Sequence, residues 1–139
     1  MNPKQFLQIG GVVLVLVGIL GFVGVIGPTA ESSLFGGAWW FDNAENWAHL
    51  VLGVVALIAA YALGANLQRP LVMVLGVVGV LVGLYSLFGY ANFLGANLEN
   101  PADSLHHLVV GAWALLASWR KSSSPIASGG MPSGMAGRM

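Results

Sequence analysis

Four apolar stretches dominate the chain and limit what it can fold into. They cover residues 6–26, 44–63, 70–90 and 101–119, and each is 19 to 21 residues long. At a rise of about 1.5 Å per residue, a helix of this length matches the thickness of a bilayer's hydrocarbon core. Barrel strands would show period-two alternation, which these stretches lack. The sequence therefore predicts an all-α bundle of four transmembrane helices.

The scarcity of charge supports a membrane location. Charged residues make up 7% of the 139 residues and hydrophobic residues 57%, whereas a soluble domain is about 25% charged. The formal net charge is zero, so nucleic acid is not an expected partner. The chain has no cysteine, which excludes disulfides, thiolate metal sites and cysteine nucleophiles. We expect the lipid bilayer to surround the protein.

The charges are separated between the two sides of the predicted bundle. The basic residues near the stretches fall on one side: Lys4, Arg69, Arg120 and Lys121. The acidic residues fall on the other: Glu31, Asp42, Glu45, Glu99 and Asp103. Because basic residues favour the cytoplasmic side, both termini are predicted to be cytoplasmic.

The chain repeats itself with an offset of 58 residues. Residues 42–53 match residues 100–111, and the same offset carries Gly18 onto Gly76. Two hairpins of the same orientation would be related by a pseudo-twofold axis along the membrane normal. The sequence thus predicts two parallel helix-hairpin repeats.

This repeat defines the expected domain organisation. A four-helix transmembrane domain is predicted over residues 1–121, with one repeat at about 6–63 and the other at about 70–119. Residues 122–139 are rich in Ser, Gly, Pro and Met, which predicts a cytoplasmic tail.

Polar residues mark the starts of the second and fourth helices. Asp42 with Glu45 three residues later is typical of a capping box, and Asn100, Pro101 and Asp103 repeat the arrangement. Capping at the membrane surface is the simplest role for these acids.

Histidines follow these acids at matching depth. His49 lies four residues after Glu45, and His107 four residues after Asp103, on one face of each helix and about 10 Å inside it. They could be axial ligands of a haem or a chlorophyll-type pigment, with the acids behind them as hydrogen-bond partners. His106 is expected to point roughly 100° away from this site.

Other roles for the histidines remain open. Each histidine could form a structural hydrogen bond to the acid one turn above it or to the backbone, or could belong to a proton or ion path. A metal site is not predicted, because one histidine and one acid per repeat are too few ligands. No serine has the histidine and acid that an activated nucleophile needs, so the chain is not expected to be an enzyme.

The pattern Asn/Asp-x-x-acid-x-x-x-His-Leu-Val-x-Gly at both even-numbered helices resembles a bacterial family of small four-helix membrane proteins known only as a domain of unknown function. The resemblance covers about residues 6–119. It implies the four-span fold and the bacterial cytoplasmic membrane, and it implies no reaction. The long tail and His106 depart from the family pattern.

Three functions are compatible with these features. Low charge, short loops and small-residue faces favour a non-catalytic accessory or structural subunit of a larger membrane complex, of respiratory or photosynthetic type, with other membrane subunits as partners. The alternative is a haem- or chlorophyll-binding membrane protein that uses His49 and His107. A small transporter or channel is the third.

Overall fold

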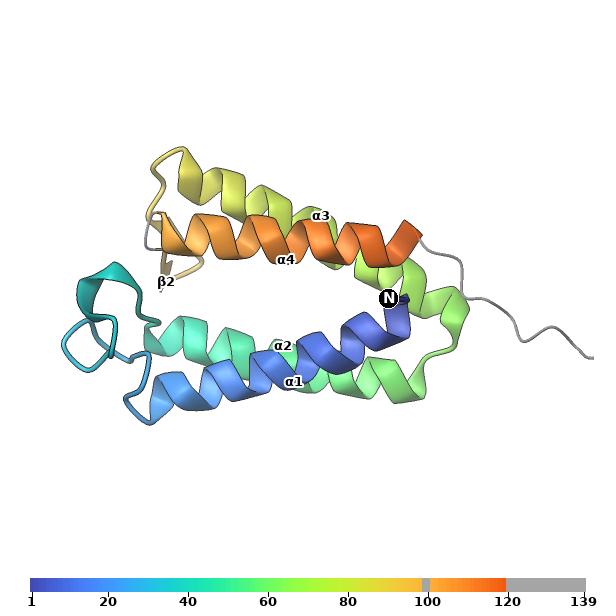
Figure 1. Ribbon diagram of the computed structural model, residues 1–139, viewed down its shortest axis with the longest axis horizontal. Helices are drawn as coiled ribbons and strands as arrows, with labels where there is room; N and C mark the ends of the chain where they lie inside the picture. The colour runs from blue at the N-terminus through green and yellow to red at the C-terminus, as the bar shows by residue number, and fades with distance from the viewer. Residues whose placement is uncertain (99–100, 120–139) are drawn as a thin grey trace, which may run out of the picture.

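The chain folds into helices joined in two hairpins (Figure 1). The structure is a computed structural model that describes residues 1–98 and 101–119. Its elements are α1 (Pro3–Phe22), the short 3-10 helix η1 (Gly36–Ala38), α2 (Asn43–Ala62), α3 (Ala65–Leu87), strands β1 (Asn92–Phe93) and β2 (Ala96–Asn97), and α4 (Ala102–Trp119). The all-α prediction is confirmed. The predicted cap at Asn100, the charges at Glu99, Arg120 and Lys121, and the tail 122–139 lie outside the described residues.

Within the described residues, three helices are long and apolar enough to cross a membrane, namely α1, α2 and α3. A membrane protein is therefore compatible with the fold. The helix α4 is not among the three, and its first two turns contain Asp103, His106 and His107.

Two helix boundaries differ by more than three residues from the predicted ones. The helix α1 ends at Phe22, four residues early, and Gly24 follows with a positive φ of 82° that turns the chain. The helix α3 begins at Ala65, so Pro70 lies inside it rather than at its start. Because proline lacks an N–H, α3 forgoes one internal hydrogen bond there.

Glycines allow the two helices of each hairpin to touch through their backbones. A Cβ atom on Gly53 of α2 would lie 2.8 Å from the carbonyl oxygen of Gly11 in α1. A Cβ atom on Gly111 of α4 would lie 2.9 Å from the carbonyl oxygen of Gly76 in α3. Both glycine pairs leave no room for a side chain, so close helix approach depends on them.

The equivalent contacts in the two hairpins are not all 58 residues apart. Gly18 packs against Leu50, and Gly83 packs in the same way against Leu108. The α2 and α4 positions thus differ by 58 residues, whereas the α1 and α3 positions differ by 65. The single offset of 58 residues predicted that Gly18 corresponds to Gly76. The contacts instead make Gly18 equivalent to Gly83. Both α1 and α3 have glycines seven residues apart, about two helical turns: Gly11 and Gly18 in α1, and Gly76 and Gly83 in α3. A sequence alignment with one offset therefore pairs Gly18 with the wrong glycine of α3.

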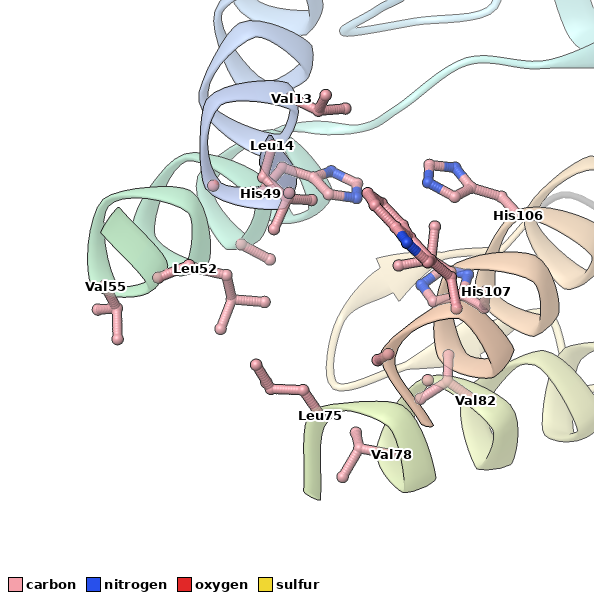
Figure 2. A pocket seen from close by; sticks show the side chains of 18 of the residues that line it. Val13, Leu14, His49, Leu52, Val55, Leu75, Val78, Val82, His106 and His107 are labelled. Carbon is pink, nitrogen blue, oxygen red and sulfur yellow. The ribbon is translucent and has the colours of Figure 1, made fainter. Parts of the chain in front are cut away.

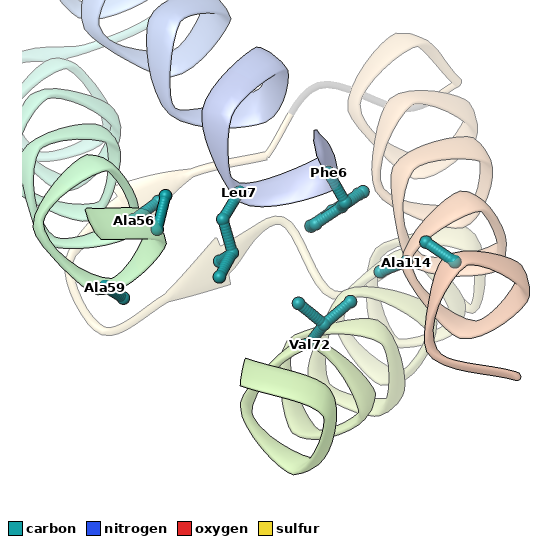
Figure 3. Close-up of a cluster of buried hydrophobic side chains, with 8 residues drawn as sticks. Phe6, Leu7, Ala56, Ala59, Val72 and Ala114 are labelled. Carbon is teal, nitrogen blue, oxygen red and sulfur yellow. The ribbon is translucent and has the colours of Figure 1, made fainter. Parts of the chain in front are cut away.

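The hairpins converge at the end where the amino terminus lies and diverge toward the opposite loops (Figure 1). Small and apolar side chains from all four helices form a core at the converging end (Figure 3): Phe6, Leu7, Ala56, Ala59, Ala60, Val72, Ala114 and Ala117. Between the hairpins, the main helix contacts are those of α1 with α3 and α4. The structure is therefore a pair of hairpins rather than an evenly packed four-helix bundle.

Two polar side chains complete the converging end. The buried Gln68 amide donates hydrogen bonds to the carbonyl oxygens of Ala60 and Leu63, at 3.0 and 2.9 Å, and so satisfies the last turn of α2. Arg69 Nε donates to the carbonyl oxygen of Ser118 at 2.9 Å, and this hydrogen bond joins the start of α3 to the end of α4.

Candidate ligand-binding site

A cavity of about 320 Å³ lies between the hairpins. All four helices and both strands contribute to its walls, which are mostly aliphatic and aromatic. Its polar side chains gather near the diverging end: Glu45, His49, His106 and His107. Cavities of this kind, apolar with a few convergent polar groups, are typical of small-molecule sites.

His49 enters the cavity from α2. Its side chain is buried, with an exposed fraction of 8%, and its Nδ1 atom has no hydrogen-bond partner. The ring of Phe41, which is fully buried, packs 4.8 Å from the imidazole between ring centres. A buried polar nitrogen at the cavity wall marks His49 as a candidate for ligand binding.

His106 enters the same cavity from α4 in the other hairpin. The centres of the His49 and His106 rings lie 6.3 Å apart, and the ring planes differ by 9°. Figure 2 shows the two side chains reaching toward each other. The prediction that His106 points away from the site is wrong. The rotation of α4 about its own axis places both of its histidines along the cavity.

His107 has a different environment from His49. Its Nδ1 atom lies 2.8 Å from the carbonyl oxygen of Asp103, one turn earlier in α4. The carbonyl can only accept, so Nδ1 of His107 donates this hydrogen bond. Its ring lies 5.7 Å from that of His106 between centres. A structural hydrogen bond thus accounts for the orientation of His107.

The acids near the site serve as caps and cross-links. Asp42 Oδ1 accepts from the Glu45 amide at 2.8 Å, and Glu45 Oε2 accepts from the Asp42 amide at 3.1 Å. The capping box predicted for α2 is therefore confirmed. Asp103 Oδ1 accepts a hydrogen bond of 3.3 Å from the Trp39 indole. Trp39 and Asp103 are 64 positions apart, and no sequence motif predicts that they are bonded.

Loops from the two hairpins meet above the histidines. Trp39, in the connection between α1 and α2, reaches Asp103 at the start of α4. Asp42 Oδ2 accepts from the Asn97 amide of β2 at 2.8 Å. These two hydrogen bonds connect the hairpins at the end where their helices diverge, so the loops cover that end of the cavity.

The donor set limits the kind of metal centre that fits. Residues 1–98 and 101–119 contain no group of three or more His, Cys, Asp or Glu side chains that could hold a metal ion. A metal held by protein alone has three or four such ligands. The cavity therefore fits a metal only where the ligand itself supplies most of the donor atoms.

No protein-family model matches the chain, and no curated protein or solved structure is detectably similar to it. Membership of the bacterial family that the sequence resembles stays a prediction. The cavity and its histidines are therefore the features that bear on function.

Proposed function

We propose that the chain is a non-catalytic membrane protein that binds a metal tetrapyrrole, of haem or chlorophyll type, between its two helix hairpins. The observation that carries this proposal is the pair His49 and His106, which come from different hairpins and face each other in one apolar cavity. His106 takes the place that the sequence assigned to His107.

The separation of the two rings is suitable for a shared metal. Two imidazoles that bind a metal from opposite sides, each with a metal–nitrogen bond of about 2.0–2.1 Å, have ring centres roughly 6 Å apart. The observed separation of His49 and His106 is 6.3 Å. A tetrapyrrole supplies four more nitrogens in a plane, so two histidines complete the coordination.

The walls of the rest of the cavity suit the apolar macrocycle, and the cavity of about 320 Å³ has to widen to hold all of it. Its walls include the aromatic rings of Phe6 and Trp113 and the aliphatic side chains of Leu14, Leu75 and Val82. Because the helices of the two hairpins contact each other mainly through α1, the cavity can widen around a ligand without separating the helices of either hairpin.

We also propose that α4 is a fourth span. Its polar residues Asp103 and Ser104 are fully buried, and its histidines line the cavity. Its outward residues are apolar and exposed: Leu105, Val109 and Leu116. The low hydropathy of α4 thus comes from residues that lipid does not touch, as expected of a span that carries a site.

The proposed orientation has both termini in the cytoplasm, in a bacterial inner membrane. Lys4 and Arg69 lie at the converging end of the hairpins, and Glu31, Asp42 and Asp103 lie toward the other end, which agrees with the positive-inside rule. Two equivalent hairpins, with contacts displaced by 58 and 65 residues, support the proposed internal repeat.

The other two functions stay predictions. An accessory subunit would pack against partner proteins, but the exposed apolar side chains of the helices are those that lipid also requires. A transporter would place charges or broken helices near the midplane, and α1 and α2 are continuous there.

A titration with iron(III) protoporphyrin IX tests the proposal. The purified full chain in detergent should develop the red-shifted absorption of a low-spin complex. His49→Ala and His106→Ala should each weaken binding by roughly tenfold or more, whereas His107→Ala, the matched control, should retain the spectrum. Absorption that is the same in wild type and in His49→Ala contradicts the proposal.

A further inference from the structure

The two hairpins differ at positions that line the cavity. Residues of α2 and α4 that are 58 apart take equivalent places, so Val55 corresponds to Trp113 and Ala48 to His106. In both pairs the residue of α4 has the larger side chain. The two sides of the cavity, one between α1 and α4 and the other between α2 and α3, are therefore filled differently.

Trp113 narrows the side between α1 and α4. Its ring packs edge to face against Phe6 of α1, with ring centres 4.8 Å apart and planes at 70°. On the opposite side the corresponding residues are Val55 and Leu71, both smaller than their aromatic counterparts. An aromatic contact thus narrows one side at the level of Phe6 and has no counterpart on the other, although Val13, farther along α1, lines the cavity and is 47% exposed.

The side between α2 and α3 is open. Leu52, Val55 and Val78 all line the cavity, yet 48%, 51% and 48% of their surfaces are exposed. The helices α2 and α3 also have few direct contacts with each other. Figure 2 shows Leu52 and Val55 on one side of the cavity and Leu75 and Val78 on the other.

The two ends of the cavity are covered. Phe41 and Leu98, fully or almost fully buried, lie beneath the loops at the diverging end, where Trp39 bonds to Asp103. The apolar core fills the converging end. A ligand therefore enters between the hairpins, and the side between α2 and α3 is the one without an aromatic contact.

We propose that the cavity opens laterally into the bilayer between α2 and α3, and that its tetrapyrrole enters from the hydrocarbon phase. Val55 is about 18 Å along α2 from its start, near the middle of a core roughly 30 Å thick. The ligand is thus a membrane-dissolved one. This inference rests on the proposed tetrapyrrole-binding function.

Uptake from vesicles tests the route. The full chain in phosphatidylcholine vesicles is mixed with vesicles that contain iron(III) protoporphyrin IX, and the growth of the bound absorption band is timed. Val55→Trp, which copies Trp113 on the open side, should slow uptake about tenfold. Val51→Trp, an exposed neighbour on α2 that does not line the cavity, should leave the rate unchanged.

The outcomes separate the two proposals. Equal uptake rates in Val55→Trp and wild type, with binding retained, overturn the lateral route alone. Failure of the wild type to bind the porphyrin from either vesicles or detergent overturns the proposed function, and with it the identity of the ligand.

A measurement without ligand tests the opening itself. The chain lacks cysteine, so a spin label can be attached to Leu52→Cys or to Val110→Cys alone, two lining positions 58 residues apart that both keep Trp113. Oxygen, which concentrates in lipid, should relax the label at Leu52→Cys more strongly than the one at Val110→Cys. Equal or reversed accessibility overturns the lateral opening even where porphyrin binds.

Discussion

The imidazole rings of His49 and His106 face each other across the cavity, 6.3 Å apart between centres and 9° from parallel. Each hairpin contributes one of the two rings. Their separation therefore depends on how the hairpins sit against each other, so the proposed ligand binding would be coupled to hairpin association.

This coupling predicts that the ligand stabilises the protein. Iron(III) protoporphyrin IX at about 100 times its dissociation constant should add roughly 2.7 kcal/mol to the free energy of unfolding. Unfolding by sodium dodecyl sulfate, followed by circular dichroism, measures the shift. The shift should disappear in His106→Ala and persist in His107→Ala, and a shift of equal size in all three proteins contradicts the coupling.

The close backbone contacts predict a sharp difference between glycines. A Cβ atom on Gly18 would lie 2.8 Å from the Asn46 carbonyl oxygen, and one on Gly83 would lie 2.9 Å from the Ser104 carbonyl oxygen. Because backbone atoms cannot easily move, Gly18→Ala and Gly83→Ala should each destabilise the protein by about 1–3 kcal/mol. Gly10→Ala is the control, since its nearest neighbour would be a Phe6 side-chain atom at 3.9 Å.

The glycine experiment also tests the register of the hairpins. If Gly18 and Gly83 are equivalent, their alanine variants should lose similar stability in the detergent titration. A tolerated Gly83→Ala together with a damaging Gly18→Ala would contradict the equivalence.

Gln68 should be the most sensitive polar residue of the converging end. Its amide donates to the last carbonyl oxygens of α2, and its side chain is 4% exposed. Gln68→Leu leaves those carbonyls without a donor and should cost about 1–3 kcal/mol of unfolding free energy. The exposed Asn66, changed to alanine, should cost less than about 0.5 kcal/mol. Equal costs would show that the amide is not needed.

Local features of the chain were predictable from the sequence. The lengths of the apolar stretches predict helices, and Asp42 with Glu45 predicts the start of α2, because a capping box involves only neighbouring residues. The boundaries of α1 and α3 were less predictable, since a glycine with positive φ ends one helix early and a proline is tolerated inside the other.

Long-range features of the site were not predictable. The place of His106 depends on the rotation of α4 against α3, which follows from backbone contacts at Gly76, Gly79 and Gly83 rather than from any motif. The bond between Trp39 and Asp103 joins loops of different hairpins. A glycine stripe repeated every seven residues also permits two registers, and only the packed helices distinguish them.

The proposal that α4 is a fourth span predicts the location of the carboxyl terminus. Green fluorescent protein fused after residue 139 should fluoresce in cells, and alkaline phosphatase fused there should be inactive, because both termini are proposed to be cytoplasmic. Fusions after Glu31, in the loop between α1 and α2, should behave oppositely. An active phosphatase at the carboxyl terminus would contradict a membrane crossing by α4.

Electron paramagnetic resonance of the iron(III) protoporphyrin IX complex tests the central claim most directly, because its low-spin signal reports both the axial ligands and the angle between their planes. Planes as close to parallel as those of His49 and His106 predict a rhombic low-spin signal that is lost in His49→Ala and in His106→Ala and kept in His107→Ala. A high-spin signal in the wild type, or a low-spin signal that survives both the His49 and the His106 substitutions, would contradict the claim that these two histidines hold the metal.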